Sequence, residues 1–222
     1  SYGDSPYQSF SAIAGNPHLI DFDLLLEAGL LEEADVEGVH FGDREDLVDY
    51  ALIYQVRRPI LEKAAQRFLA DDRNKALLAA FEKANSSWLN DYAEFMAIKE
   101  SFGNKALQEW DDQAVIARNE EVLAQYRIDL ADQIDYFKVC QYFFFSQWKA
   151  LKAYANDHHI KIIGDMPIYV SADSVEVWTK PQLFKLDSER KPTFVAGVPA
   201  DQFSADGQLW GNPLYDWDEH EK

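Results

Sequence analysis

Glycine and proline are unevenly distributed along the 222-residue sequence, and their distribution divides it into three zones. Residues 1–42 hold five glycines and two prolines, and residues 164–222 hold four glycines and five prolines. Between them, residues 43–163 hold only Gly103 and Pro59. Because glycine and proline interrupt helices and mark turns, the middle zone is predicted to be helical and the two ends to consist of strands and loops.

Apolar residues of the middle zone recur at helical spacing. Four residues of the segment 44–69 share one helix face: Leu47, Tyr50, Ala51 and Tyr54. Pro59 is expected either to kink this helix or to start a new one. A second helix is expected after Ser86 or Ser87, either of which can cap it, with Gly103 just beyond its end.

A long helix is predicted within residues 120–157. One apolar stripe along it consists of Leu130, Ile134, Phe137, Phe144, Trp148 and Leu151. Phe143 and Phe145 lie off this stripe, so the helix is expected to be buried on more than one side. An aromatic stripe of this kind is far more typical of core packing than of a cofactor site.

The segment IKIIGDMPIYV, residues 160–170, is predicted to contain a buried strand. Ile160, Ile162 and Ile163 form a nearly continuous β-branched run, which is the pattern of a strand in a parallel sheet. A helix followed by such a strand indicates the α/β class. Asp165 comes directly after the strand, where parallel sheets and barrels place their active sites. Its position alone favours a functional carboxylate and a loop-bracing one equally.

Two loop segments combine aromatic with polar side chains. Residues 3–17 include one strong acid, Asp4, and offer hydrogen-bonding groups on Ser5, Tyr7, Gln8, Ser9, Ser11 and Asn16. Residues 196–217 set polar and aromatic side chains together: Asp201, Gln208, Asn212, Phe203 and Trp210. Aromatic faces beside amides and carboxylates suit a sugar. A protein–protein patch, an ordinary turn or a loop with core-packed aromatics has the same composition, so these alternatives stay open.

The charge of the chain excludes several classes of partner. A net charge of −18 argues against nucleic acid and against an anionic membrane surface, and leaves neutral ligands or cations open. Cys140 is the single cysteine, which favours a reducing compartment and, among apolar neighbours, an inert thiol. Neither a signal peptide nor a membrane-spanning run is recognisable, so a cytoplasmic location is expected. Calcium-loop, phosphate-loop and HExxH patterns are also missing, so no metal site is expected.

Three segments, taken in order, resemble one enzyme family. They are GDSPYQSFSAIAGNP, GDMPIYVSADSVEVWTKPQLF and VAGVPADQFSADGQLWGNPLYDW, and they resemble the 4-α-glucanotransferases, or amylomaltases, of glycoside hydrolase family 77. The resemblance covers the whole chain, although residues 20–155 match by general character only. It implies a partial (β/α)₈ TIM barrel with a large helical insertion. Residues 1–42 would then be a barrel strand-end loop, 43–157 the insertion subdomain, and 158–222 a barrel strand with a substrate-binding flap.

The resemblance also implies an activity. Members of this family transfer α-1,4-glucan segments between maltooligosaccharides by a retaining double displacement, which needs two carboxylates about 5 Å apart and no metal or other cofactor. A non-catalytic glucan-binding module and an α-glucan hydrolase on the same barrel remain as alternatives. The motifs that carry the family's nucleophile and acid/base are missing here. We therefore expect an internal fragment, inactive by itself, with both carboxylates beyond Lys222.

Site residues are carried over from the family motif by motif. The residues expected to bind substrate are Ser5, Tyr7, Asp165, Asp201, Trp210 and Asn212, with Phe203 and Gln208 as weaker candidates. Asp165 is expected to bind hydroxyls of the glucose at the cleaved bond. Ala200 replaces a second proline that is common before Asp201, so this turn is expected to be less rigid. Tyr215 and Trp217 are expected to anchor the flap.

Overall fold

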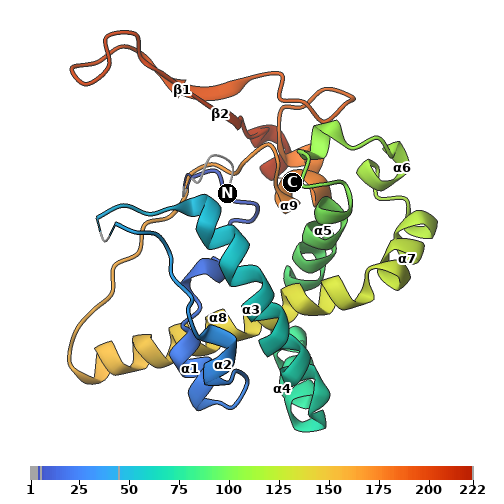
Figure 1. Cartoon of the computed structure of the whole chain (residues 1–222). Coiled ribbons are helices and arrows are strands. Elements are labelled where there is room, and N and C mark those ends of the chain that lie inside the picture. Colours follow the sequence, from blue (N-terminus) through green and yellow to red (C-terminus); the bar gives the residue numbers. More distant parts are fainter. Residues whose placement is uncertain (1–4, 6, 45, 222) are drawn as a thin grey trace. The chain divides into compact units, whose positions relative to one another are not determined.

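A computed structural model describes residue 5, residues 7–44 and residues 46–221 of the chain. Its α-helices are α1 (Phe22–Glu27), α2 (Glu33–Val36), α3 (Tyr50–Ala70), α4 (Asp72–Ala84), α5 (Leu89–Ser101), α6 (Gln113–Ile116), α7 (Glu120–Asp129), α8 (Ala131–Asp157), α9 (Val175–Thr179) and α10 (Trp217–His220). Short 3₁₀ helices are η2 (Pro17–Leu19), η3 (Leu107–Glu109) and η4 (Pro181–Leu183), and the strands are β1 (Val195–Val198) and β2 (Gln208–Pro213). The helical middle zone is thus confirmed (Figure 1).

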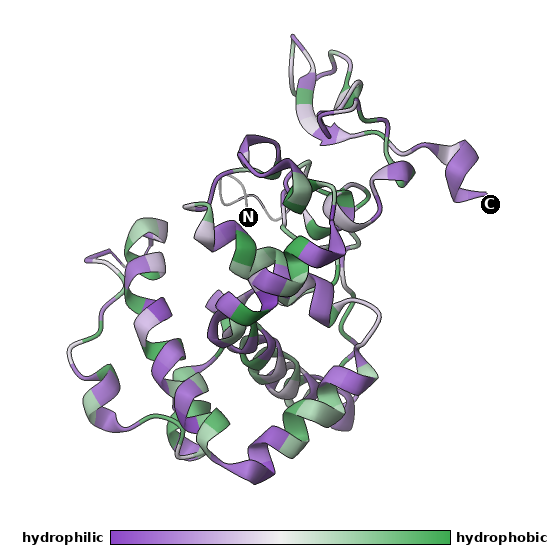
Figure 2. Cartoon of the chain, turned by 90° about the vertical axis from the view of Figure 1, so that its right-hand side faces the viewer, coloured by the Kyte–Doolittle hydropathy of each residue, from purple (hydrophilic) through white to green (hydrophobic). Residues whose placement is uncertain are grey.

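The described chain forms two compact units that interleave in the sequence. The first unit contains residues up to 14, residues 94–131 and residues from 165 onward, and the second contains residues 15–93 and 132–164. Each unit therefore depends on contacts between segments that are far apart in the chain. Figure 2 shows hydrophobic and hydrophilic residues interleaved along the helices, which is the pattern of helices with one buried face.

In the second unit, α8 holds the segment that precedes α1. The Gln141 amide is fully buried, accepts a hydrogen bond from the Gly15 N–H at 2.8 Å and donates one to the Gly15 carbonyl at 3.0 Å. Gln147 does the same to the backbone of Asp21, at 2.8 and 3.0 Å. Two side-chain amides of one helix therefore satisfy backbone groups of residues 15–21 that no sheet or helix pairs.

The expected long helix is two helices, α7 and α8, with a break at Leu130. Ile134 and Phe137 of the predicted stripe are buried, and so is Phe143 from another face, which confirms burial on more than one side. Trp148 and Leu151 lie farther along α8 and are exposed. The predicted stripe therefore becomes a core surface only in the first half of α8.

Helix boundaries agree in part with the signals in the sequence. Helix α3 runs through Pro59 without ending, so this proline starts no new helix. Helix α5 begins at Leu89, and Ser86 and Ser87 lie in the turn before it. Gly103 follows α5 at φ +67°, a left-handed conformation typical of a helix end.

The first unit has its own hydrophobic core. Its buried members are Phe95, Ile98, Leu107, Trp110, Val115, Ile116, Leu123, Val170, Val175, Val177, Trp178 and Phe184. The Trp178 indole N–H, which is fully buried, donates to the Val115 carbonyl at 3.0 Å. This core fixes α9 and the residues around Val170, which border the candidate site.

The strand predicted over residues 160–163 is absent from the described structure. Residues 160–169 form an irregular trace between α8 and α9 (Figure 1), and the Ile163 side chain is 94% exposed. A parallel strand obtains its hydrogen bonds from neighbouring strands, and the only strands in the described residues are β1 and β2. The described fold is therefore helix-rich with a small antiparallel sheet, and the predicted α/β barrel is not visible in it.

Strands β1 and β2 turn the predicted flap into an antiparallel hairpin (Figure 1). The register pairs Val198 with Gln208, and a bulge separates the pairs of Val195 and Gly197. Gly207 closes the loop 199–207 at φ +73°, and a Cβ atom there would lie 2.5 Å from the Val198 carbonyl oxygen. Only glycine fits this position.

None of the helices in the described ranges is long and apolar enough to cross a membrane.

Candidate functional site

Tyr7 and Asp165 meet in the first unit. The Tyr7 hydroxyl donates to the Asp165 carboxylate at 3.2 Å, although 158 residues separate them in the sequence. Tyr7 is 57% exposed and Asp165 is also exposed, so the ring face and the carboxylate both reach solvent. Two residues predicted from different motifs therefore form one polar and aromatic surface. Asp4, from the first motif, lies outside the described residues.

A local turn presents Tyr7. The Ser5 hydroxyl accepts a hydrogen bond from the Tyr7 N–H at 3.3 Å, and the Ser5 carbonyl accepts one from the Gln8 N–H at 3.1 Å. Serine side chains commonly close such turns by bonding to the backbone two residues on. The Ser5 hydroxyl thus supports the loop that carries Tyr7.

Asn212 is at the centre of the hydrogen bonds between this loop and β2. Asn212 is only 3% exposed. Its amide Nδ2 donates to the Tyr7 carbonyl at 3.3 Å and to the Val170 carbonyl at 2.9 Å. The Gln8 amide donates to Asn212 Oδ1 and to the Trp210 carbonyl, both at 2.9 Å. The Asn212 side chain, expected to line the surface, is therefore buried beneath it.

Trp210 lies on the exposed part of β2. Its indole N–H donates to the Gln208 side-chain oxygen at 3.0 Å, and the residue is 39% exposed. The Trp210 ring lies 6.3 Å from the ring of Tyr169. An exposed aromatic ring and an amide are thus held beside each other on one strand.

The hairpin loop is braced by Asp201. Its Oδ1 atom accepts hydrogen bonds from the N–H groups of Phe203 and Ser204, at 2.8 and 2.9 Å. The Ser204 hydroxyl in turn donates to the Gly207 carbonyl at 2.7 Å. One oxygen of the Asp201 carboxylate therefore orders the loop, and Phe203, 84% exposed, stands at its surface.

Tyr215 anchors the hairpin in an aromatic cluster. Its ring stacks on Tyr169 at 6.0 Å and lies 5.4 Å from Phe184. Burial, followed by the nearby charge of Glu176, raises the pKa of the Tyr215 hydroxyl above its usual range. Trp217 contacts the Tyr215 ring at 5.2 Å but is 65% exposed, so Tyr215 carries most of the anchoring contact.

Helix α9 holds the other side of the Tyr7 loop. Glu176 Oε1 accepts from the Ser11 hydroxyl at 3.1 Å and from the Ala12 N–H at 2.8 Å. The Val175 N–H donates to the Phe10 carbonyl at 2.9 Å. The loop is therefore fixed between α9 and β2, and Tyr7 is presented from a rigid support.

A buried ion pair completes the support, and we did not predict it from the sequence. Lys99 of α5 lies 2.5 Å from Asp173, and both side chains are less than 10% exposed. Asp173 also accepts from the Leu107 N–H at 3.0 Å, and Lys99 donates to the Lys105 carbonyl at 2.7 Å. In the sequence, Lys99 directly follows the apolar run FMAI, and a lysine that such a run draws into the core needs a partner there.

Comparison with known proteins shows the family to which this chain belongs. The family model described as 4-alpha-glucanotransferase, glycoside hydrolase family 77, matches residues 1–222. The chain belongs to this family. The resemblance inferred from the three motifs is thereby confirmed.

Several 4-alpha-glucanotransferases are similar to this chain over its whole length. That of Streptococcus pneumoniae is 57% identical and that of Clostridium butyricum 47% identical, each over 100% of this chain. The amylomaltase from Streptococcus agalactiae, solved in complex with acarbose, matches with a TM-score of 0.96 and 61% identity over 100% of this chain. The chain covers only 44%, 45% and 44% of these three proteins, so it spans less than half the length of each.

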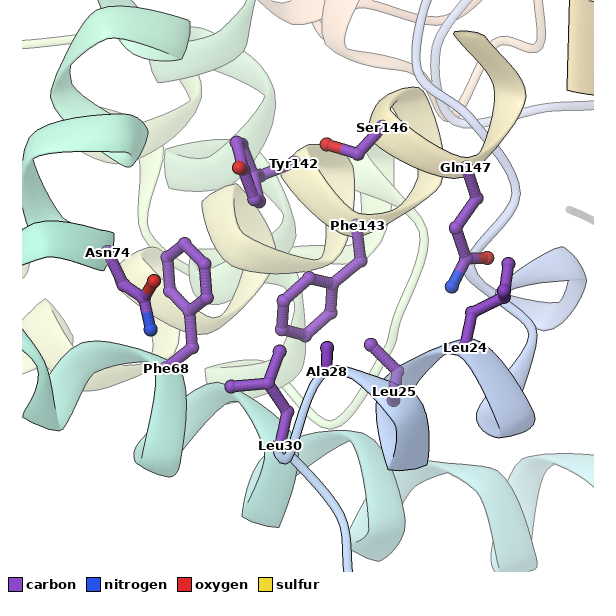
Figure 3. A pocket seen from close by; sticks show the side chains of 10 residues that line it. All are labelled: Leu24, Leu25, Ala28, Leu30, Phe68, Asn74, Tyr142, Phe143, Ser146 and Gln147. Atoms are coloured by element: carbon purple, nitrogen blue, oxygen red, sulfur yellow. The ribbon is translucent and has the colours of Figure 1, made fainter. Parts of the chain in front are cut away.

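This member of the glucanotransferase family also has a cavity in its second unit, and none of its lining residues is a predicted site residue (Figure 3). Its volume is about 260 Å³, and it is lined by Leu24, Leu25, Ala28, Leu30, Phe68, Asn74, Tyr142, Phe143, Ser146 and Gln147. Phe68 and Phe143, which line it, are themselves buried, with ring centroids 5.3 Å apart. Because the two rings pack edge to face and are almost inaccessible, neither offers a stacking surface to a sugar.

Proposed function

We propose that the intact protein containing this chain is a 4-α-glucanotransferase, which moves α-1,4-glucan segments between maltooligosaccharides. The observation that carries the proposal is the Tyr7–Asp165 hydrogen bond. It joins two of the motifs that resemble the family, and it leaves a ring and a carboxylate facing solvent. Family membership over the whole chain supports the same activity.

The substrate is a neutral oligosaccharide. Asp165 accepts hydrogen bonds from sugar hydroxyls, and the rings of Tyr7 and Trp210 contact the apolar face of glucose units. We place Gln208, Asp201 and Phe203 at the edge of this surface, on the hairpin. The neighbour from Streptococcus agalactiae was solved with acarbose, which supports an oligosaccharide ligand for the present chain. A net charge of −18 also suits an uncharged ligand.

The reaction proceeds by a retaining double displacement. One carboxylate attacks the anomeric carbon as the glycosidic bond breaks, and the second carboxylic acid protonates the leaving oxygen. The second carboxylate then takes the proton of the acceptor hydroxyl, whose oxygen attacks the anomeric carbon and displaces the first carboxylate. We assign neither carboxylate to this chain. Its residues hold the glucose ring next to the cleaved bond in a fixed orientation, which contributes to the rate by positioning the reacting atoms.

The finer fold is part of a (β/α)₈ barrel, with residues 43–157 as a helical insertion and residues 1–42 and 158–222 as barrel segments. Exposed Ile163 and Ile168, 94% and 73% accessible, support this proposal. Apolar side chains at such exposure are typical of a surface that another part of the protein covers. We also propose a cytoplasmic location, which the single buried cysteine supports.

Incubation of the intact protein with maltotriose tests the proposal. A glucanotransferase redistributes chain lengths and releases glucose while the number of reducing ends stays constant. A hydrolase raises that number, and a binding module changes neither. A rise in reducing ends in step with glucose release would replace transfer by hydrolysis.

A further inference from the structure

We propose that Gln8 and Asn212 form a positioning pair, which holds the Tyr7 hydroxyl against Asp165, and that Asn212 does so without touching substrate. The inference rests on the proposed glucan-binding role of Tyr7 and Asp165. It adds two residues whose function is to fix the relative position of the two substrate-binding groups.

Burial and hydrogen-bonding capacity exclude Asn212 itself from sugar binding. The residue is 3% exposed. Both N–H groups of its amide are used, one by the Tyr7 carbonyl at 3.3 Å and one by the Val170 carbonyl at 2.9 Å. Its oxygen accepts from Gln8 at 2.9 Å. A side-chain amide has two donors and one acceptor oxygen, so every group already has a protein partner.

The two carbonyls that Asn212 binds belong to the two sides of the substrate surface. One is the carbonyl of Tyr7, the residue whose hydroxyl reaches Asp165 at 3.2 Å. The other is the carbonyl of Val170, which ends the irregular segment carrying Asp165. A single buried amide on β2 therefore sets the distance between the backbone of Tyr7 and the segment of Asp165.

Gln8 fixes the orientation of that amide. Its Nε2 donates to the Trp210 carbonyl and to Asn212 Oδ1, both at 2.9 Å. Because Gln8 presents a donor to the Asn212 oxygen, the Asn212 nitrogen must face the carbonyls of Tyr7 and Val170. The flipped orientation would leave buried donors and acceptors without partners, which destabilises the fold, so this orientation is strongly preferred.

A substitution at Asn212 can turn its attraction for the Tyr7 and Val170 carbonyls into repulsion, and the chain also offers a matched control. Asn212→Asp keeps the oxygen that accepts from Gln8 but turns a carboxylate oxygen toward two carbonyls, which repel it. Asn119→Asp makes the same change of charge in the same unit. Asn119 is exposed and only accepts hydrogen bonds, from the N–H groups of Glu121 and Val122, and a carboxylate accepts these equally well.

The experiment measures two quantities on the intact protein: hydrogen exchange of the backbone amides in residues 7–12, and glucose release from maltotriose. We expect Asn212→Asp to speed exchange in residues 7–12 and to lower kcat/KM by at least about tenfold. Asn119→Asp should change neither. Exchange that stays as slow as in the wild type, in a folded variant that has lost activity, would overturn the inference.

A second variant and a double variant separate positioning from general stability. Gln8→Met keeps the size of the side chain and leaves both donor bonds of Asn212 in place, so it should fold and show the same changes at smaller amplitude. In a Tyr7→Phe background, Asn212→Asp should cost much less activity than in the wild type, because both changes act through the Tyr7–Asp165 contact. Fully additive losses would overturn the inference. If the wild type transfers no glucan, the proposed function fails, and hydrogen exchange alone decides the positioning role.

Discussion

The Tyr7 hydroxyl and the Asp165 carboxylate lie 3.2 Å apart, and each is held by a different part of the first unit. Tyr7 lies in a turn closed by Ser5, and α9 and β2 support its loop on both sides. Asp165 lies on an irregular segment whose far end, Val170, is buried in the core. The two groups are therefore already in contact before any ligand arrives, which lowers the entropic cost of binding.

Asp165→Asn tests the carboxylate. The amide keeps the size of the side chain but loses the negative charge and one of its acceptor oxygens, so hydrogen bonds to sugar hydroxyls weaken. We expect glucose release from maltotriose by the intact protein to fall by at least about tenfold, which corresponds to about 1.4 kcal/mol. Asp218→Asn, an exposed change in α10, serves as the control. A loss below about twofold for Asp165→Asn would remove this residue from the site.

Tyr7 contributes a ring and a hydroxyl, which two substitutions separate. Tyr7→Phe keeps the ring and loses the donor to Asp165, whereas Tyr7→Ala loses both. If the ring contacts glucose, kcat/KM should fall further in Tyr7→Ala than in Tyr7→Phe, by about 1 kcal/mol or more. Equal losses in the two variants would show that the ring makes no contact with substrate.

The buried ion pair makes a prediction about stability. Lys99→Met leaves the Asp173 carboxylate buried without its cation, and such a loss typically costs about 3–5 kcal/mol in the free energy of unfolding. Urea denaturation measures this cost. Lys191→Met breaks the exposed pair with Glu189, where the two charges lie 2.6 Å apart in solvent, and should cost far less than Lys99→Met. Similar costs for the two variants would mean that the Lys99 pair is well solvated.

The second unit should lose stability in acid through Asp35. A hydrogen bond from Arg67, then the backbone of Glu32 and a hydrogen bond from Lys63, lower the pKa of the Asp35 carboxyl far below its usual range. A carboxyl with a lowered folded-state pKa stabilises the protein fully above its ordinary pKa, and this contribution is lost as the pH falls through that value and toward the folded one.

Asp35→Asn should therefore flatten the acid limb of the stability curve. We expect the free energy of unfolding of the wild type to fall more steeply below about pH 4 than that of the variant. Urea denaturation at a series of pH values measures both slopes. Parallel curves would show that Asp35 titrates in the folded protein as it does in the unfolded chain.

The sequence predicted the composition of the site better than the orientation of its members. Tyr7 and Asp165 come from separate motifs, and the structure brings them into contact. Asn212 is in the same short motif as Trp210, yet one is buried and the other partly exposed. A bulge in the hairpin and the left-handed Gly211 between them decide which way each points, and neither is readable from residue types.

The remaining differences between prediction and structure depend on which distant segments pack or pair with each other. Ile160, Ile162 and Ile163 have the composition of a strand, but a strand needs a paired neighbour, which the described residues do not provide. Helical spacing correctly grouped Ile134 with Phe137, but it also grouped Trp148 with them, and that residue is exposed. Periodicity identifies a face of a helix, whereas the length over which that face is covered depends on what packs against it.

A structure of the intact protein with bound acarbose tests the central claim most directly. We predict a sugar hydroxyl within about 3.2 Å of an Asp165 carboxylate oxygen and a sugar ring in contact with Tyr7 or Trp210. We also predict that Asn212 stays buried and makes no contact with the ligand. Acarbose bound only elsewhere, for example in the cavity lined by Phe68 and Tyr142, with Tyr7 and Asp165 facing solvent, would contradict it.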